Sequence, residues 1–167
     1  MDALIRRVAH TLRDSQRTVA TAESCTGGWL AKCLTDLPGS SQWLLAGWVV
    51  YSNAAKQRDL GVPATTLARH GAVSAATVEA LARAALRRSG ADLAVAISGI
   101  AGPSGAVPGK PVGTVWFAFA QRRGRGVRVE THRQRFLGDR DAVRRKAVIA
   151  ALRGLYSTAK FGTLYIA

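Results

Sequence analysis

Ser24 stands between a short β-prone run and a segment with the pattern of a helix. Its surroundings, Thr21–Gly28, read TAESCTGG, so a strand ends and a helix begins within a few residues. A serine at such a corner is held away from the sheet, and the free N–H groups of a helix N-terminus can stabilise an oxyanion beside it. The segment is a candidate nucleophile site, although an ordinary N-cap serine followed by glycines for tight packing has the same pattern.

Lys56 occupies a similar corner. It ends the segment YSNAAK, Tyr51–Lys56, in which a second apolar strand gives way to a helix. A lysine acts as a general base only if burial or a nearby positive field lowers its pKa. Because the sequence offers no evident His–Asp pair, Ser24 and Lys56 form a workable nucleophile and base. The alternative interpretation is a solvent-exposed lysine on the first turns of a helix.

A third polar segment, Ser98–Gly105, follows another apolar run and continues to Lys110–Thr114. Its glycines would let backbone N–H groups approach a ligand closely. It lacks the Gly-Lys-Ser/Thr ending and the following helix of a Walker loop. A ligand-binding loop and a plain surface loop are both compatible with this composition.

The hydrophobic pattern predicts the elements that position these segments. Apolar residues at helical spacing predict helices over residues 3–12, 27–37, 54–60, 74–90 and 139–156. Apolar or β-branched runs predict strands over residues 18–22, 44–51, 93–97, 112–121 and 127–136, the last two forming a hairpin. Ligands of α/β proteins gather where such strands end.

The order of these elements indicates the fold class. Strands and helices alternate over the first two thirds of the chain and a hairpin follows, so we expect an α/β protein, a three-layer α/β/α sandwich with a mixed sheet. Without a repeat or an internal boundary, we expect one domain over residues 1–156. Residues 157–167 continue the helical pattern poorly and are either a docked extension or a disordered tail.

Composition narrows the function classes. The 167 residues carry a formal net charge of +14, which favours anionic partners. The basic segments lack interleaved aromatic residues and a known nucleic-acid motif, so we interpret them as a solvated basic face that attracts a phosphorylated small molecule rather than nucleic acid. With no secretory signal and no apolar run near the ~18 residues of a membrane span, the expected location is the cytoplasm, without membrane contact.

The possible metal ligands have no suitable spacing. Cys25 and Cys33 fit no zinc or redox motif, and we expect two reduced, half-buried thiols. The three histidines are isolated from one another. We therefore expect no metal site.

Seven short segments follow one another along the chain: TAESCTGG (21–28), GSS (39–41), YSNAAK (51–56), GAVS (71–74), SGIAGPSG (98–105), KPVGTVWFA (110–118) and GDRDAVRR (138–145). Together they resemble the C-terminal domain of the competence/damage-inducible protein CinA and its stand-alone relatives, the nicotinamide-nucleotide amidohydrolases. Each motif is weak alone, but the ordered set is highly specific. The sequence departs from the family at Ser104, where many relatives have aspartate, at Val50, where threonine is common, and after Tyr156.

The resemblance implies a CinA C-terminal-domain-like fold and hydrolysis of nicotinamide mononucleotide to nicotinic acid mononucleotide and ammonia, in pyridine nucleotide recycling. Ser24 would attack the carboxamide carbon and Lys56 would take the proton and return it. The N–H groups of Thr26 and Gly27 would hold the oxyanion, and water would hydrolyse the acyl-enzyme. No cofactor or metal is expected, because the pyridinium of the substrate already activates the amide.

The resemblance also implies substrate-binding residues. Tyr51 is expected to stack on the ring or to hydrogen-bond to the reacting centre, and Ser41 to line the same pocket. Ser98, with the turn from Gly99 to Gly102, is expected to hold ribose and phosphate. Each of these residues has a purely structural alternative.

Two arginines are candidates for the phosphate. Arg140 stands at the start of the last predicted helix, and Arg144 lies one turn further on. Arg144 has an alternative role in an ion pair with Asp141 or Asp139.

Two other functions stay open from the sequence. One is a non-catalytic module that binds nucleotides in the same pocket, and the other is a nucleic-acid-binding accessory protein of the competence or DNA-damage response. For assembly we expect a homodimer, by family likeness and because two-fold dimers are the commonest oligomers.

Overall fold

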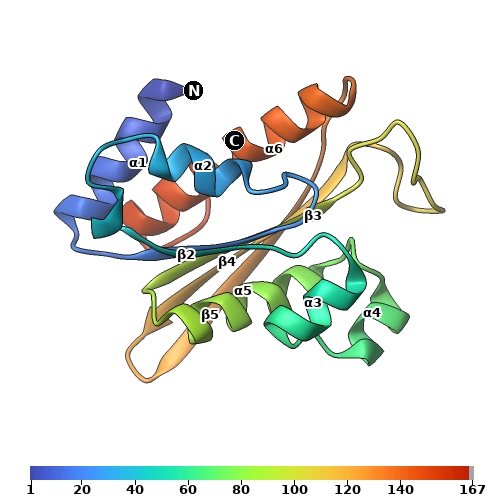
Figure 1. The fold of residues 1–167 in the computed structure, drawn as a ribbon, viewed down its shortest axis with the longest axis horizontal. Coiled ribbons are helices and arrows are strands. Elements are labelled where there is room, and N and C mark those ends of the chain that lie inside the picture. Colours follow the sequence, from blue (N-terminus) through green and yellow to red (C-terminus); the bar gives the residue numbers. More distant parts are fainter. Residues whose placement is uncertain (166–167) are drawn as a thin grey trace.

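The computed structural model describes residues 1–165, which form a five-stranded mixed sheet between two layers of helices (Figure 1). In chain order the elements are α1 (Asp2–Asp14), β1 (Val19–Glu23), α2 (Trp29–Thr35), the 3-10 helix η1 (Ser40–Gln42), β2 (Leu44–Val49), α3 (Asn53–Leu60), α4 (Ala64–His70), α5 (Ala75–Ser89), β3 (Leu93–Gly99), β4 (Thr114–Arg123), β5 (Gly126–Arg135) and α6 (Arg140–Phe161). The predicted three-layer α/β/α class is confirmed.

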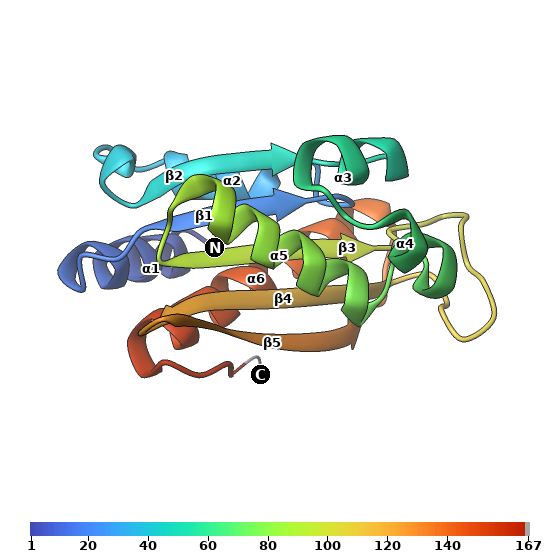
Figure 2. The same ribbon diagram turned by 90° about the horizontal axis from the view of Figure 1, so that it is seen from below.

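The strands lie in the order β2-β1-β3-β4-β5 (Figure 2). Strand β1 is parallel to β2 and β3, whereas β4 is antiparallel to β3 and β5. The carboxyl ends of β1, β2 and β3 therefore lie at one edge of the sheet. The polar corners that follow these three strands meet there.

The burial of the strands explains the layers. Every residue of β1 is buried, as is β3 up to its last residue, so these strands are covered on both faces. Such strands need helices on both sides. Helices α1, α2 and α6 cover one face, and α3, α4 and α5 cover the other (Figures 1 and 2). Each layer has its own apolar core against the sheet.

Two sequence predictions about the helices are corrected. Helix α4 was not expected, because it is short, begins after Pro63 and buries only Leu67. Helix α6 continues to Phe161, so the expected end at Tyr156 is wrong. The added turn buries Ser157 and Thr158, whose polar side chains hid the periodicity.

The described part of the tail docks on α6. The backbone N–H of Tyr165 donates to Ser157 Oγ at 2.8 Å, and the Tyr165 ring packs edge-on against Phe161. Of the two alternatives for this segment, the docked extension therefore holds up to residue 165. Within residues 1–165, no helix combines the length and apolarity required to cross a membrane.

Gly154 lets α6 pack directly on β4. A Cβ atom at this position would overlap the ring of Phe119, which is buried in the core. An aromatic ring held between a helix and a sheet cannot move aside without disturbing its neighbours. Packing against this ring therefore explains a glycine in the middle of the helix, where glycine is otherwise unfavourable.

We expect Gly154→Ala to lower the free energy of unfolding by about 1–3 kcal/mol, the usual cost of overpacking a core. Helix propensity alone predicts the opposite sign, a gain of about 1 kcal/mol. Urea unfolding of the wild type and the variant measures the difference. In a Phe119→Ala background the same substitution should be neutral or stabilising, and an equal loss in both backgrounds would show that the ring does not impose the glycine.

Candidate active site

The candidate site lies where the parallel strands end. Ser24 directly follows β1, and its backbone N–H donates to the carbonyl of Ile97 in β3 at 2.9 Å. Val50 directly follows β2 and donates to the carbonyl of Glu23 at 2.8 Å. The sheet therefore fixes the backbone on both sides of the Ser24 corner.

Lys56 and Ser24 are hydrogen-bonded. Ser52 caps α3 by accepting the N–H of Ala55 at 3.0 Å, which places Lys56 in the first turns of the helix. The distance from Lys56 Nζ to Ser24 Oγ is 3.1 Å. Lys56 is 1% exposed and Ser24 is 7% exposed. The predicted approach of these side chains is confirmed, and the alternative of a solvent-exposed lysine is wrong.

Two backbone carbonyls complete the surroundings of the lysine. Lys56 Nζ donates to Val50 O at 2.8 Å and to Tyr51 O at 3.0 Å. A neutral amine has two hydrogens and one lone pair. If the hydrogens bind the two carbonyls, the lone pair is left for the third neighbour, the hydroxyl of Ser24.

Burial favours that neutral amine. Burial lowers the pKa of Lys56 from the ordinary 10.5, because a charged group is disfavoured away from water. A Cys25 thiolate would oppose this effect, but burial raises the pKa of that thiol to about 12, so it is uncharged at neutral pH. Among residues 1–165, no carboxylate forms an ion pair with Lys56. Both cysteines are free and buried, as expected for reduced thiols.

A buried carboxylate, Glu23, organises the turn after Ser24. It accepts hydrogen bonds from Thr26 Oγ1 at 2.7 Å, from the N–H of Leu30 at 2.9 Å and from the N–H of Ala31 at 2.8 Å. It thus ties the turn to the first N–H groups of α2. Sequence reasoning missed this role, although a carboxylate that ends an otherwise apolar strand was a usable signal.

The turn changes the expected oxyanion donors. The N–H of Gly27 donates to the carbonyl of Ser24 at 3.0 Å, so it is not free to bind an oxyanion, contrary to expectation. The N–H of Thr26 has no acceptor among the residues described. Thr26 therefore stays a candidate donor.

The two arginines of α6 reach the site by different contacts. Arg140 donates to Tyr51 Oη at 3.0 Å and to Gly102 O at 2.8 Å, so it joins the exposed Tyr51 to the glycine-rich loop. Arg144 donates to Cys25 O at 3.1 Å and to Thr26 O at 3.2 Å. Its alternative pairing with aspartate is absent among the described ion pairs.

Structural contacts explain the third polar segment. Ser98 is buried and donates to Ala72 O at 2.8 Å. A Cβ at Gly99 would lie 2.7 Å from a methyl of Val115, and one at Gly102 would lie 2.6 Å from a methyl of Val112. The expected contacts of Ser98, Gly99 and Gly102 with ribose and phosphate stay predictions.

Ser41 lies at the wrong end of the sheet. It belongs to η1, which precedes β2, whereas Tyr51 follows that strand. The six residues of β2 at about 3.3 Å each separate the two ends by about 20 Å. Within one chain, the expectation that Ser41 lines the same pocket as Ser24 is therefore wrong.

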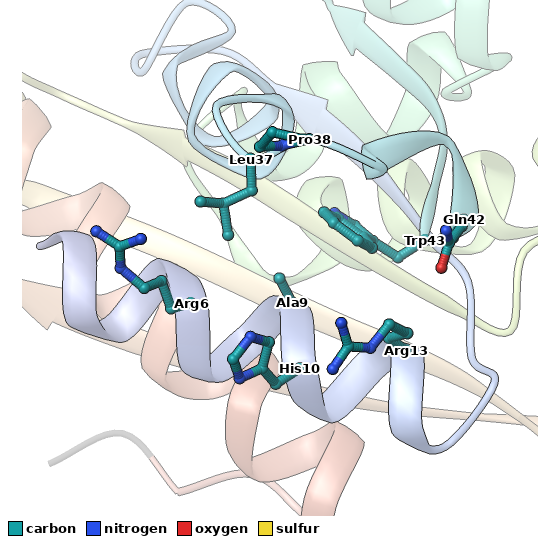
Figure 3. A pocket seen from close by; sticks show the side chains of 8 residues that line it. All are labelled: Arg6, Ala9, His10, Arg13, Leu37, Pro38, Gln42 and Trp43. Atoms are coloured by element: carbon teal, nitrogen blue, oxygen red, sulfur yellow. The ribbon is translucent and has the colours of Figure 1, made fainter.

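Two pockets differ in their relation to this site. One of about 510 Å³ opens beside the turn and is lined by Thr26, Gly27, Gly28, Trp29, Lys32 and Arg144. Another of about 220 Å³ lies between α1 and the segment after α2, with Arg6, His10 and Arg13 on one side and Leu37, Pro38 and Trp43 on the other (Figure 3). Only the first pocket adjoins the Ser24 turn. Among residues 1–165, no three His, Cys, Asp or Glu side chains cluster as metal ligands would.

Comparison with known proteins decides the family. Residues 1–159 match the model of the CinA C-terminal domain. The chain belongs to this family. Its match extends beyond Tyr156, in agreement with the longer α6.

Several relatives of this CinA domain are similar in length. The nicotinamide-nucleotide amidohydrolase PncC of Escherichia coli K12 is 55% identical over 92% of this chain and 91% of its own. The protein of the same name from Pseudomonas putida is 55% identical over 91% and 92%. A CinA-like protein of Geobacter sulfurreducens is 50% identical, but the chain covers only 34% of it.

Solved structures agree with the fold. A CinA superfamily protein of Klebsiella pneumoniae superposes with a TM-score of 0.89 at 43% identity, over 96% of this chain and 98% of its own. The competence/damage-inducible protein CihA of Agrobacterium tumefaciens gives 0.86 at 43% identity, over 90% of each chain.

We expect Glu23→Gln to lower the free energy of unfolding by about 2–3 kcal/mol, because the amide replaces one acceptor oxygen by a donor that faces backbone N–H groups or the Thr26 hydroxyl. Chemical denaturation measures the loss. The matched control is Glu79→Gln, which removes an exposed pair with Arg83 and should cost less than about 1 kcal/mol. Equal losses for both variants would contradict an organising role of Glu23.

Proposed function

We propose that this CinA domain hydrolyses the carboxamide of nicotinamide mononucleotide to nicotinic acid mononucleotide and ammonia, through an acyl-enzyme on Ser24. The mechanism rests on one observation, the buried Lys56 Nζ at 3.1 Å from Ser24 Oγ. The substrate class is supported by the similar amidohydrolases, which match over nine tenths of both chains.

Acylation begins with neutral Lys56. Its lone pair takes the proton of the Ser24 hydroxyl as Oγ attacks the carboxamide carbon. The carbonyl oxygen becomes an oxyanion, which receives the N–H of Thr26. As the tetrahedral intermediate collapses, the carbon–nitrogen bond breaks. Protonated Lys56 delivers its proton to the leaving nitrogen, and ammonia departs.

Deacylation repeats these steps with water. Lys56 is neutral again after ammonia has left, and it takes a proton from the water that attacks the ester carbon. The second tetrahedral intermediate collapses, the ester bond to Oγ breaks, and Lys56 returns the proton to Ser24. The products are nicotinic acid mononucleotide and the free enzyme.

The substrate carries two opposite charges. Arg140 is the candidate for the phosphate, because it lies at the exposed rim with Tyr51 and keeps N–H groups beyond the two already used. The pyridinium ring, placed near Tyr51, would disfavour a second positive charge on Lys56. Substrate binding would then favour the neutral base.

The cellular setting is also part of the proposal. We place the enzyme in the cytoplasm, in pyridine nucleotide recycling, as one domain that assembles into a homodimer. The net charge of +14 would attract a phosphorylated substrate. No cofactor is required by the steps above.

We expect ammonia release from nicotinamide mononucleotide by the wild type, with or without a chelator. Ser24→Ala and Lys56→Ala should each lower kcat by at least about 1,000-fold, because nucleophile and base act as a unit. Circular dichroism checks their folding. The matched controls are Ser15→Ala and Lys160→Ala, on exposed residues elsewhere, which should retain full activity.

The alternatives give other results. Full activity of the Ser24→Ala variant would contradict an acyl-enzyme on Ser24. A wild type that binds the nucleotide without releasing ammonia would instead be a non-catalytic binding module. Tight, steeply salt-dependent binding of DNA without turnover would favour the nucleic-acid accessory protein.

We expect kcat to rise with pH through the pKa of Lys56, because only the unprotonated amine can accept a proton. Since burial lowers that pKa, the acidic limb of the pH profile should lie below the 10.5 of an ordinary lysine. Activity is thus lost as the pH falls. A profile of kcat against pH measures this, and a midpoint at or above 10.5 would contradict a base tuned by burial.

A further inference from the structure

One arginine holds two consecutive carbonyls of the turn after Ser24. Arg144, on α6, donates from Nε to Cys25 O at 3.1 Å and from Nη2 to Thr26 O at 3.2 Å. The guanidinium also lies 5.5 Å from the ring centre of Trp29 at the start of α2. It is half-buried, so these contacts are shielded from water on one side.

A carbonyl held in this way fixes the N–H of the same peptide group. The carbonyl of Cys25 and the N–H of Thr26 belong to one planar peptide group, which is trans. In a trans peptide the two groups point in opposite directions. Arg144 therefore directs the Thr26 N–H away from itself. Its charge also polarises the peptide, which makes that N–H a stronger donor.

Thr26 is held on its other sides as well. Its hydroxyl donates to the Glu23 carboxylate at 2.7 Å, and its carbonyl accepts from Arg144. The next peptide is fixed because the N–H of Gly27 donates to Ser24 O. Of the two polar backbone groups of Thr26, the carbonyl has a donor, whereas the N–H has no acceptor among the residues described.

We infer that Arg144 is a positioning residue for the reaction at Ser24, which orients and polarises the Cys25–Thr26 peptide so that the Thr26 N–H stabilises the oxyanion. The inference rests on the proposed function, since it assigns a role within that reaction. Arg144 was also a candidate for the phosphate, and its guanidinium keeps N–H groups beyond the two that bind the carbonyls, so the test must separate the two roles.

The test compares two substrates that share the amide but differ in the phosphate. Nicotinamide mononucleotide carries the phosphate, and nicotinamide riboside lacks it. A positioning residue affects the chemical step of both, so Arg144→Gln and Arg144→Ala should lower kcat by about 10- to 100-fold on each, with KM nearly unchanged; complete removal of a donor costs about 100- to 1,000-fold. Added guanidinium should restore part of the activity of Arg144→Ala.

The matched control is Arg145→Gln, which removes the same charge from an exposed position on the same helix and should leave kcat unchanged. A loss confined to nicotinamide mononucleotide, expressed in KM, would assign Arg144 to the phosphate and overturn the inference. So would wild-type kcat in both Arg144 variants.

A second readout separates this inference from the proposed function. Acylation of Ser24 by p-nitrophenyl acetate also forms an oxyanion beside this turn, but it needs no nucleotide site. If the wild type releases no ammonia, the proposed function fails, yet the burst of p-nitrophenol still reports on the turn. A slower burst in Arg144→Ala with rescue by guanidinium supports the positioning role, and an unchanged burst overturns it.

Discussion

The buried hydrogen bond between Lys56 and Ser24 is the constraint on which the site depends. Removing a lysine head from water is costly unless its polar atoms find partners. Here the bend between β2 and α3 supplies two carbonyls and the end of β1 supplies a hydroxyl, so all three neighbours of Nζ are polar. That arrangement requires β1 and β2 to be parallel neighbours, since only then do their carboxyl ends lie together. Burial destabilises the charged form of Lys56 and so also lowers its pKa, which means that the cost of burial and the availability of the neutral amine as a base have one cause.

The turn after Ser24 is fixed by charges of opposite sign from two layers of the fold. Glu23, at the end of a central strand, accepts from the N–H groups and the hydroxyl of the segment, whereas Arg144, on a covering helix, donates to its carbonyls. An anion and a cation thus divide the polar groups of one short segment between them. A backbone held in this way needs little reorganisation when charge develops beside it, which is the property that an oxyanion site requires.

The sequence predicted most elements from local patterns: apolar runs, helix caps and polar corners after strands. Those corners made Ser24 and Lys56 candidates, and the family resemblance selected them over their structural alternatives. It failed where the answer depends on three-dimensional contacts. Gly27 was expected to offer a free N–H, but the tight turn uses it. Ser41 belongs to a recognised motif, yet the parallel direction of β2 puts it at the far end of the sheet. The local spacing of Arg144 suggested an aspartate partner, whereas a tertiary contact with the Ser24 turn occupies it.

The proposed substrate and the protonation state of Lys56 would be coupled. A pyridinium close to Nζ repels an ammonium but not an amine. The enzyme with a neutral Lys56 would therefore bind the substrate more tightly than the enzyme with a protonated Lys56. Linkage requires the converse: bound substrate lowers the pKa of Lys56 further than burial does alone. A phosphate at Arg140 would oppose this effect only in part, because the guanidinium would partly neutralise its charge and water would screen it at the exposed rim beside Tyr51. The base would then be deprotonated most readily when its substrate is in place, which lets a lysine act as a base without a histidine or a metal ion to activate it.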